Sequence, residues 1–183
     1  MAKSKLDRAI TAVLLLCVLV LIYFGLSAVA IFRKKTMPVC INSMLDCMTA
    51  YAMLVQDFDE DAVVESNEYY RELIEKDLGL RFYLYSEGEL DRYVGKTYMT
   101  IRRITIDESA KGYQYCWAFA HEAMHLKHFI KHEEFVTFET FKFLYEHEEL
   151  HNVGVALALK TLEGGYSGEY DISNYIINYL TKN

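Results

Sequence analysis

All six histidines of the chain fall between positions 121 and 151, and four of them follow a helical spacing. They stand at i, i+4, i+7 and i+11, so they share one face of a helix: His121, His125, His128 and His132. His121 and His125 lie one turn apart and can both direct a ring nitrogen toward the same ion. Glu122 lies about 100° round the helix from His121, beside the ion but not in a ligand position. His121 and His125 are therefore predicted metal ligands, and His128 and His132 are interpreted as a polar helix edge.

A zinc ion is the cofactor that this arrangement favours. Zinc held by two histidines and one carboxylate keeps an open coordination position, and water there is far more acidic than bulk water. Glu122 is placed to take the proton of that water and to pass it to a leaving amine. We therefore expect Zn²⁺ as cofactor, Glu122 as general base and hydrolysis of a peptide or protein as the reaction.

The same five-residue pattern occurs twice, and the flanking residues separate the two copies. The first copy reads CWAFA-HEAMH-L, with no charged neighbour and no charge at its two variable positions. Such surroundings keep a site dry and preorganised. The second copy, at 147–151, follows Glu146 and contains Glu149, which is typical of a solvated helix face. We expect the first copy to be functional and the second to lie at the surface.

The histidines lie in a long stretch that is predicted to be helical. From Tyr113 to Val153 there is neither glycine nor proline. This stretch is too long for one helix in so small a domain, and the polar patch at 131–134 is predicted to break it into an antiparallel pair. Glycines at 164, 165 and 168 are expected to end the second helix. Tyr170 to Leu180 is predicted to form a last short helix.

The residues before the histidines predict strands and two further helices. Leu80 to Tyr85 and Lys96 to Asp107 are rich in aromatic or in Thr and Ile residues and are predicted strands. The second is expected to bulge at Arg102-Arg103, where its alternation slips, and 97–106 is the candidate edge strand for an extended substrate. Ile41 to Phe58 is predicted to be a helix, packed on the domain or near a membrane surface. Ser66 is expected to cap a further helix that ends before Gly79. This order predicts an α+β domain.

The motif and its setting resemble the zincin metallopeptidases, and among them the short gluzincin-like members such as the ImmA/IrrE-type peptidases. The resemblance covers roughly residues 80–165: a strand before the active helix, the HEAMH helix, and a second helix that carries acids. It implies a zincin-like fold, with a small antiparallel or mixed sheet, an active-site helix and a following antiparallel helix. It also implies His121 and His125 as ligands, Glu122 as base, and a third ligand glutamate on the following helix. The chain has no Glu-x-x-x-Asp or Glu-Ala-Asn signature there, and Lys131 stands where a metzincin has its third histidine.

Geometry ranks the candidates for this third ligand. If the first helix runs one turn past His125 and the chain reverses at 131–133, Glu139 comes back level with the histidine pair. Glu139 also stands alone among the aromatic residues of 135–141, where an unpartnered carboxylate is costly. We therefore predict Glu139 as the third ligand, with Glu146 and Glu149 as alternatives for a looser reversal. Glu133 and Glu134 are interpreted as turn acids.

The uncharged run from Ala9 to Phe32 predicts a transmembrane helix. Its 24 residues at about 1.5 Å each span roughly 36 Å, against a hydrocarbon core of about 30 Å. A cleaved signal peptide is the alternative, but its apolar region would be shorter, about 7–15 residues. Three basic residues stand on each side of the run, so the positive-inside rule gives no orientation. We expect a single-pass membrane protein with an anchor at 1–35, a helical linker at 36–79 and a metal-binding domain at 80–183, acting on a substrate near the bilayer.

The sequence also bears on other classes of function. The net charge of −7, without a basic stripe beyond the membrane flank, argues against nucleic acid as a partner. Glu122-x-x-His125 and Glu148-x-x-His151 on neighbouring helices would suit a di-iron carboxylate protein, although such bundles need two more long helices. A non-catalytic, membrane-anchored zincin-like binding protein that lacks a third ligand is the other alternative.

Overall fold

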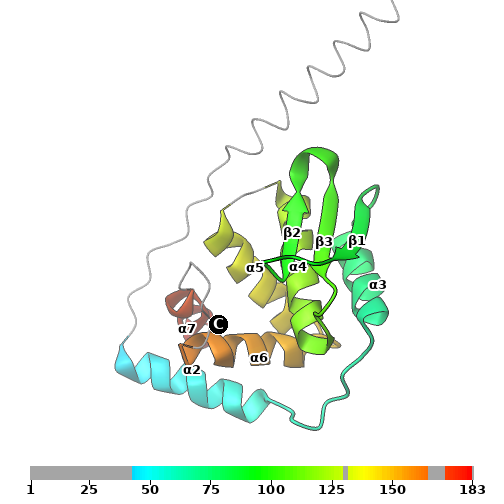
Figure 1. Ribbon diagram of the computed structural model, residues 1–183. Helices are drawn as coiled ribbons and strands as arrows, with labels where there is room; N and C mark the ends of the chain where they lie inside the picture. The colour runs from blue at the N-terminus through cyan, green and yellow to red at the C-terminus, as the bar shows by residue number, and fades with distance from the viewer. Residues whose placement is uncertain (1–42, 130–131, 165–171, 183) are drawn as a thin grey trace, which may run out of the picture. The chain divides into compact units, whose positions relative to one another are not determined.

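The computed structural model describes residues 43–129, 132–164 and 172–182 (Figure 1). The predicted membrane span at 9–32 lies outside these residues. Among the helices that the structure does describe, none combines the length and the hydrophobicity needed to cross a bilayer. The described residues belong to one compact unit, in which the described part of the predicted linker region packs with the metal-binding region.

In the described part of the chain two helices precede the sheet, and each begins at a serine cap. Helix α2, Met44–Asp57, begins at Ser43, which forms a reciprocal capping box with Asp46. Helix α3, Asn67–Leu78, begins at Ser66, whose hydroxyl accepts a hydrogen bond from the Tyr69 amide. Gly79 closes α3 in the left-handed conformation, at φ 64°. Helix α2 packs on the C-terminal helices and α3 packs on the central helix of the domain.

The sheet has three strands in the order β1-β3-β2: Leu84–Gly88 (β1), Gly95–Tyr98 (β2) and Arg103–Asp107 (β3). Strand β1 is parallel to β3, with Leu84 opposite Arg103, and β2 is antiparallel to β3. A mixed sheet of this kind agrees with the predicted α+β class.

The predicted strand boundaries need two corrections. The first strand starts four residues later than expected and continues to Gly88, because Phe82 has a φ of 57° and interrupts the extended chain. The predicted strand at 96–107 is a hairpin of two strands, joined by the 3-10 turn η1, Met99–Ile101, and by Arg102 at φ 48°. The slip in alternation at Arg102-Arg103 is therefore a chain reversal and not a bulge.

Among the residues that the structure describes, four helices follow the sheet: Gly112–His128 (α4), Glu133–Glu146 (α5), His151–Leu162 (α6) and Ser173–Lys182 (α7). The predicted break at 131–134 separates α4 from α5. The second predicted helix is itself divided, because the chain turns at His147–Leu150 before α6 begins. The second copy of the histidine motif forms this turn. The His147 ring forms a hydrogen bond with the Asp77 carboxylate of α3 and accepts a hydrogen bond of 3.1 Å from the Glu149 backbone amide. The His151 ring forms a hydrogen bond with the Tyr145 carbonyl.

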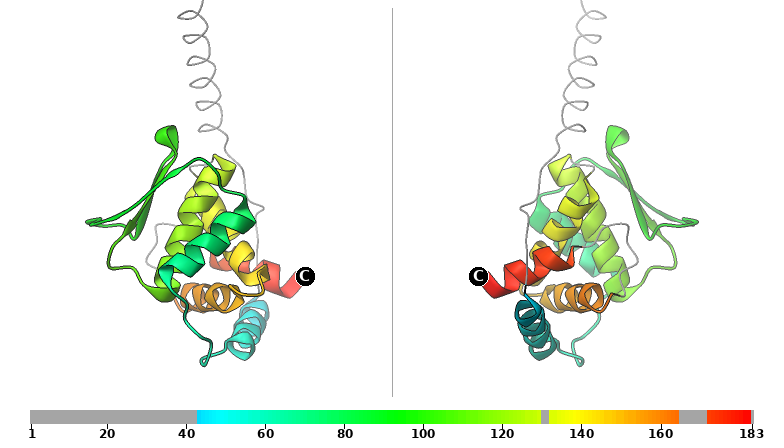
Figure 2. Two further views of the ribbon diagram at one scale, coloured as in Figure 1. Left: turned by 90° about the vertical axis from the view of Figure 1, so that its right-hand side faces the viewer. Right: turned by 90° about the vertical axis from the view of Figure 1, so that its left-hand side faces the viewer.

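Helix α4 packs against one face of the sheet, and α3 lies beside α4, where the Arg71 guanidinium is 4.8 Å from the centre of the Tyr85 ring of β1 (Figure 2). The other described helices lie away from the sheet. Ile104 and Ile106 of the central strand are fully buried on that face. Tyr85 of β1 also points toward α4, where its ring meets Phe119 edge-on at 5.9 Å. Because successive strand residues alternate between faces, the opposite face carries Leu84, Lys96 and Arg103, and no described helix covers it.

Candidate metal centre

Helix α4 is buried along most of its length, and the first histidine motif lies in its buried part. His121, Glu122 and His125 are only 8%, 8% and 6% exposed. Small and apolar neighbours, among them Ala120 and Ala123, are inaccessible to solvent. This is the dry setting that the uncharged flanks predict. Ionisable groups are rarely buried unless they have a partner.

The partner of both histidines is Glu133. Its Oε2 atom lies 3.0 Å from His121 Nε2 and 3.2 Å from His125 Nε2, and the two ring nitrogens are 3.2 Å apart. Across 43–129, 132–164 and 172–182, this is the one place where three or more His, Cys, Asp or Glu side chains gather closely enough to hold one ion. We call these three residues the His-Glu group.

The structure does not bring Glu139, the predicted third ligand, into this group. Helix α4 ends at His128 and Phe129 turns the chain at φ 50°, so α5 begins with Glu133 at the level of the histidines. Glu139 lies six residues further on, about 9 Å along the helix axis, and its carboxylate is 3.8 Å from Lys142 Nζ. The predicted geometry has the second helix run past the histidines before one of its glutamates reaches them. In the structure the first residue of α5, Glu133, already lies against the histidines, so Glu133 is not a simple turn acid.

The alternative acids are also engaged elsewhere. Glu146 accepts a hydrogen bond from the Tyr179 hydroxyl of α7, and Glu149 accepts one from the Tyr69 hydroxyl of α3. Glu148 and His151, the second Glu-x-x-His pair, are not members of the His-Glu group. The group that could hold one ion therefore includes histidines of the first copy of the motif and no residue of the second.

Hydrogen bonding alone does not satisfy the three contacts of the His-Glu group. An imidazole nitrogen either carries a proton or offers a lone pair. If both Nε2 atoms donate to Glu133, two N–H groups face each other across 3.2 Å. If either nitrogen is deprotonated, its lone pair faces the carboxylate. A cation satisfies all three lone pairs together, and the edges of a tetrahedral zinc site with bonds of 2.0–2.1 Å are roughly 3.3–3.4 Å, close to the three observed separations.

The charge state of Glu133 suits a metal ligand. Burial by itself would raise the pKa of this carboxyl group. The hydrogen bonds and the charge of the two neighbouring rings, His121 and His125, outweigh burial and hold the pKa well below its ordinary value. Glu133 is therefore a carboxylate at neutral pH, which is the form that binds a cation. Its place in the first turn of α5 adds a favourable interaction with the positive end of that helix.

Strand β2 fixes the position of Glu122. The Thr97 hydroxyl donates a hydrogen bond of 2.9 Å to the Glu122 carbonyl. A Cβ atom on Gly95 would lie 2.8 Å from Glu122 Cγ and 3.1 Å from its Oε1, so only glycine leaves room for this side chain. Sequence reasoning missed Gly95, although a glycine beside a strand can mark the close approach of another group.

The aromatic residues around the histidines have mixed roles. The ring of Trp117, one turn before His121, lies 5.7 Å from the His121 ring. Nδ1 of His121 is buried and has no hydrogen-bond partner in the described part of the chain, whereas metal-binding histidines usually donate this second N–H. The His128 ring packs edge-on against Phe135 at 5.8 Å and is not a member of the His-Glu group.

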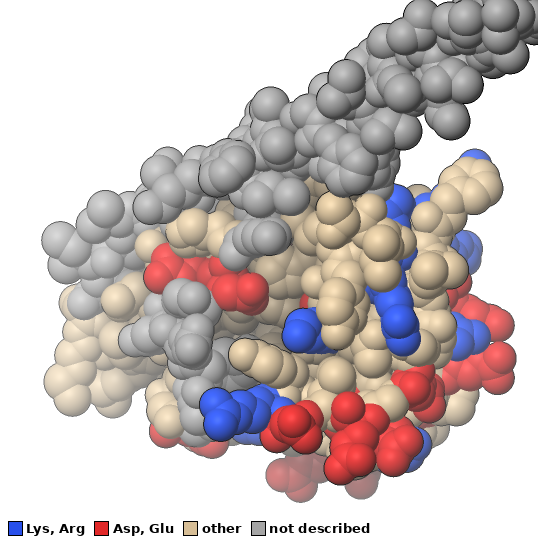
Figure 3. All heavy atoms as spheres, turned by 45° about the horizontal axis from the view of Figure 1, so that its top comes forward, with Lys and Arg blue, Asp and Glu red and all other residues tan. Residues whose placement is uncertain are grey.

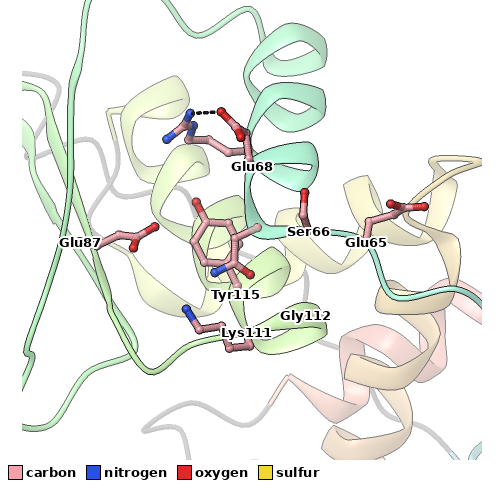
Figure 4. A pocket seen from close by; sticks show the side chains of 9 residues that line it. Glu65, Ser66, Glu68, Glu87, Lys111, Gly112 and Tyr115 are labelled. Carbon is pink, nitrogen blue, oxygen red and sulfur yellow. Dashed lines mark ion pairs between the residues drawn. The ribbon is translucent and has the colours of Figure 1, made fainter.

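An open hollow of about 630 Å³ lies elsewhere, between the start of α3, Glu87 at the end of β1 and the first turn of α4 (Figure 4). Its lining includes both basic and acidic side chains: Arg71, Lys111, Glu65, Glu68 and Glu87. Arg71 and Glu68 form an ion pair at 3.8 Å. The Tyr115 hydroxyl is bonded to Tyr85 at 2.8 Å. None of the metal-centre residues lines this hollow, and we assign it no chemistry.

No protein-family model, curated protein or solved structure matched the chain significantly. The resemblance to zincins therefore rests on the motif, on the helix pair that follows the sheet and on the His-Glu group.

Proposed function

We propose that the chain is a membrane-anchored, zinc-dependent peptidase. The observation that carries this proposal is the His-Glu group, in which two helices bring three ligand atoms within 3.0–3.2 Å of one another. Glu122 is buried next to this group and is not part of it. A carboxylate that is held beside three ligands, but is not one of them, is what a general base at a zinc site requires.

His121, His125 and Glu133 would hold the ion and leave its fourth position open. Zinc in such a site supplies Lewis acidity and makes water acidic enough to be deprotonated near neutral pH. The Glu122 carboxylate would accept the proton of the attacking water and deliver it to the leaving nitrogen of the peptide. The buried surroundings of α4 would exclude other water and strengthen these interactions.

The edge of the sheet next to the site would hold the substrate. Strand β2 is an edge strand, since the order is β1-β3-β2, and it contacts α4 at Glu122 through Thr97. An extended peptide can add to such an edge through backbone hydrogen bonds. Only Thr97 and Tyr98 of the predicted edge strand at 97–106 lie on this edge, because β3 is the central strand.

The membrane part of the proposal rests on the sequence. The uncharged run at 9–32 has the length of a single-pass anchor, and basic residues follow it at 33–35. An anchor of this kind would restrict the substrates to peptides or proteins near the bilayer.

The proposed mechanism is tested with the full chain in detergent, loaded with zinc and assayed against a library of quenched fluorogenic peptides. We expect Glu122→Gln to keep its zinc and to lose hydrolysis by at least about 100-fold, the lower range of a general-base contribution. His121→Ala should lose the metal as well. Hydrolysis that persists in Glu122→Gln would contradict the mechanism.

Elemental analysis of the same preparations separates the alternatives. Two irons per chain would support the di-iron hypothesis. One zinc with four protein ligands and no hydrolysis would support a non-catalytic binding protein, because closed zinc sites are structural.

A further inference from the structure

One end of the sheet exposes a group of apolar and basic side chains, which we call the sheet-end patch. Its apolar members are far more exposed than is usual for such residues: Phe82 at 93%, Leu84 at 60%, Ile101 at 58% and Tyr98 at 39%. Its basic members are Arg81, Lys96, Arg102 and Arg103. Apolar side chains that cluster at a surface mark interaction sites more often than isolated ones do.

The fold assembles this patch from two separate segments, 81–84 and 96–103. Parallel pairing of β1 with β3 sets Leu84 opposite Arg103, and antiparallel pairing of β2 sets Tyr98 opposite the same residue. Arg102 then joins the segments, since its guanidinium donates hydrogen bonds of 3.2 Å to the carbonyls of Arg81 and Phe82. Phe82 and Arg102 both have positive φ angles, a conformation that costs energy in residues other than glycine. The patch is therefore held in place and is not a frayed end.

The charges of the patch are not neutralised by acids of the domain. In the part of the chain that the structure describes, no Asp or Glu carboxylate lies within 4.0 Å of its basic groups. Instead Lys96 lies over the Tyr98 ring at 5.2 Å, and Arg103 lies over the same ring at 6.0 Å. In Figure 3, which brings the upper end of the Figure 1 view forward, Lys and Arg stand among uncharged side chains, and acidic side chains lie toward the left, the right and the lower edge of the view. The patch is thus locally cationic in a chain with a net charge of −7.

We propose that the sheet-end patch docks on the surface of a bilayer that contains anionic lipids. Lys and Arg near such a surface are attracted by its negative potential, and exposed Phe, Tyr, Leu and Ile side chains enter the boundary between headgroups and acyl chains. A nucleic acid would share the cations and could stack on the aromatic rings. A nucleic acid would not bury the aliphatic side chains of Leu84 and Ile101, which are more than half exposed.

Helix α2 offers a second exposed apolar face, but its charge does not suit the same partner. Met44, Met48 and Val55 are 80%, 62% and 52% exposed on one side of this helix. The helix contains no basic residue, and it carries Asp46 and Asp57. Anionic lipids would repel these carboxylates, so the observations favour the sheet end.

Docking at the patch would also place the metal centre close to the bilayer. The Arg102 guanidinium lies over the ring of Phe129, the residue that ends α4, at 5.4 Å. His125 is one turn earlier in α4, about 6 Å along the axis. This consequence rests on the proposed function. The docking itself does not, because no metal ligand belongs to the patch.

Hydrogen exchange of the full chain in lipid nanodiscs tests the docking. We compare nanodiscs of phosphatidylcholine alone with nanodiscs that also contain phosphatidylserine. Exchange at 81–84 and 98–103 should slow several-fold only with phosphatidylserine, and high salt should reverse the effect. Equal exchange in both lipids, or slower exchange at α2 and not at the sheet end, would overturn the proposal. Protection of the patch by oligouridylate without any dependence on lipid would assign it to nucleic acid and would also overturn it.

Variants of the full chain separate docking from a change in folding. Phe82→Asp with Ile101→Asp should abolish the lipid-dependent protection, whereas the matched pair Met44→Asp with Met48→Asp on α2 should keep it. Arg81→Gln with Lys96→Gln removes two charges and no apolar surface, and it should weaken the protection while exchange in α4 stays unchanged. Full protection in this charge variant would contradict the role of anionic lipid.

Discussion

The Glu133 carboxylate lies between two imidazole rings at the point where two helices meet. It contacts His121 and His125 within 3.2 Å, whereas Glu139 of the same helix pairs with Lys142 and Glu146 accepts a hydrogen bond from Tyr179. Its pKa is held well below the ordinary value, which keeps it ionised for a cation. The role of the whole centre therefore depends on this one residue more than on any residue outside the HEAMH segment.

Glu133→Gln should lower zinc affinity by at least about 100-fold. Replacing a residue that only hydrogen-bonds to a metal ligand already lowers metal affinity by about 10–100-fold, and Glu133 is proposed to bind the metal directly. Glu139→Gln, a change of the same kind six residues later on α5, should bind zinc as the wild type does. Competition with a chromogenic zinc chelator measures both affinities. Equal losses in the two variants, or a loss in Glu139→Gln alone, would show that the third ligand has been misassigned.

At the scale of the elements, the contact between β2 and α4 positions Glu122, the proposed general base. Gly95 leaves the space that the Glu122 side chain occupies, and Thr97 bonds to the Glu122 carbonyl. The strand that would bind a substrate thus also fixes the residue that would act on it.

Gly95→Ala should displace the Glu122 side chain and lower peptide turnover by more than about tenfold, because misplacement of a reacting group by 1 Å can cost 100-fold. Zinc content should stay at the wild-type level, since Glu122 is not a ligand. Gly88→Ala is the matched control, because a Cβ at Gly88 meets no atom within 4 Å. Turnover, zinc content and melting temperature are measured together. Unchanged turnover in Gly95→Ala would show that β2 does not position Glu122 for the reaction.

The elements that local chemistry determines could be predicted from the sequence. Helix α3 lies where Ser66 and Gly79 cap it, and the uncharged flanks of His121 to His125 correctly indicated a buried helix. The hairpin could not be foreseen, because its reversal has no glycine or proline and depends on Arg102 in a left-handed conformation. The turn between α5 and α6 likewise depends on a bond from His147 to Asp77, which is 70 residues earlier in the chain.

The candidate site was predictable only in part. His121, Glu122 and His125 follow from helical spacing within one element. Glu133 comes from the next helix, and its identity depends on where the chain reversal ends, which is not a local property of the sequence. Gly95 depends on the distance between a strand and a helix in the same way.

At the scale of the whole molecule, an acidic chain gathers basic residues at one end of its sheet. Arg81 and Arg103 are far apart in the sequence, so no basic stripe is visible there, and parallel strand pairing brings their segments together. The sheet-end patch and the end of α4 lie next to each other through Arg102 and Phe129. The proposed docking surface and the proposed hydrolytic centre would then act together on substrates at the bilayer surface.

X-ray absorption at the zinc edge of the full chain, purified with zinc, tests the central claim most directly. We predict one zinc per chain with two imidazole nitrogens and oxygen ligands at about 2.0–2.2 Å, and the loss of this spectrum in Glu133→Gln. A chain that binds no zinc, or a first shell that contains sulfur at about 2.3 Å, would contradict the metal centre of His121, His125 and Glu133.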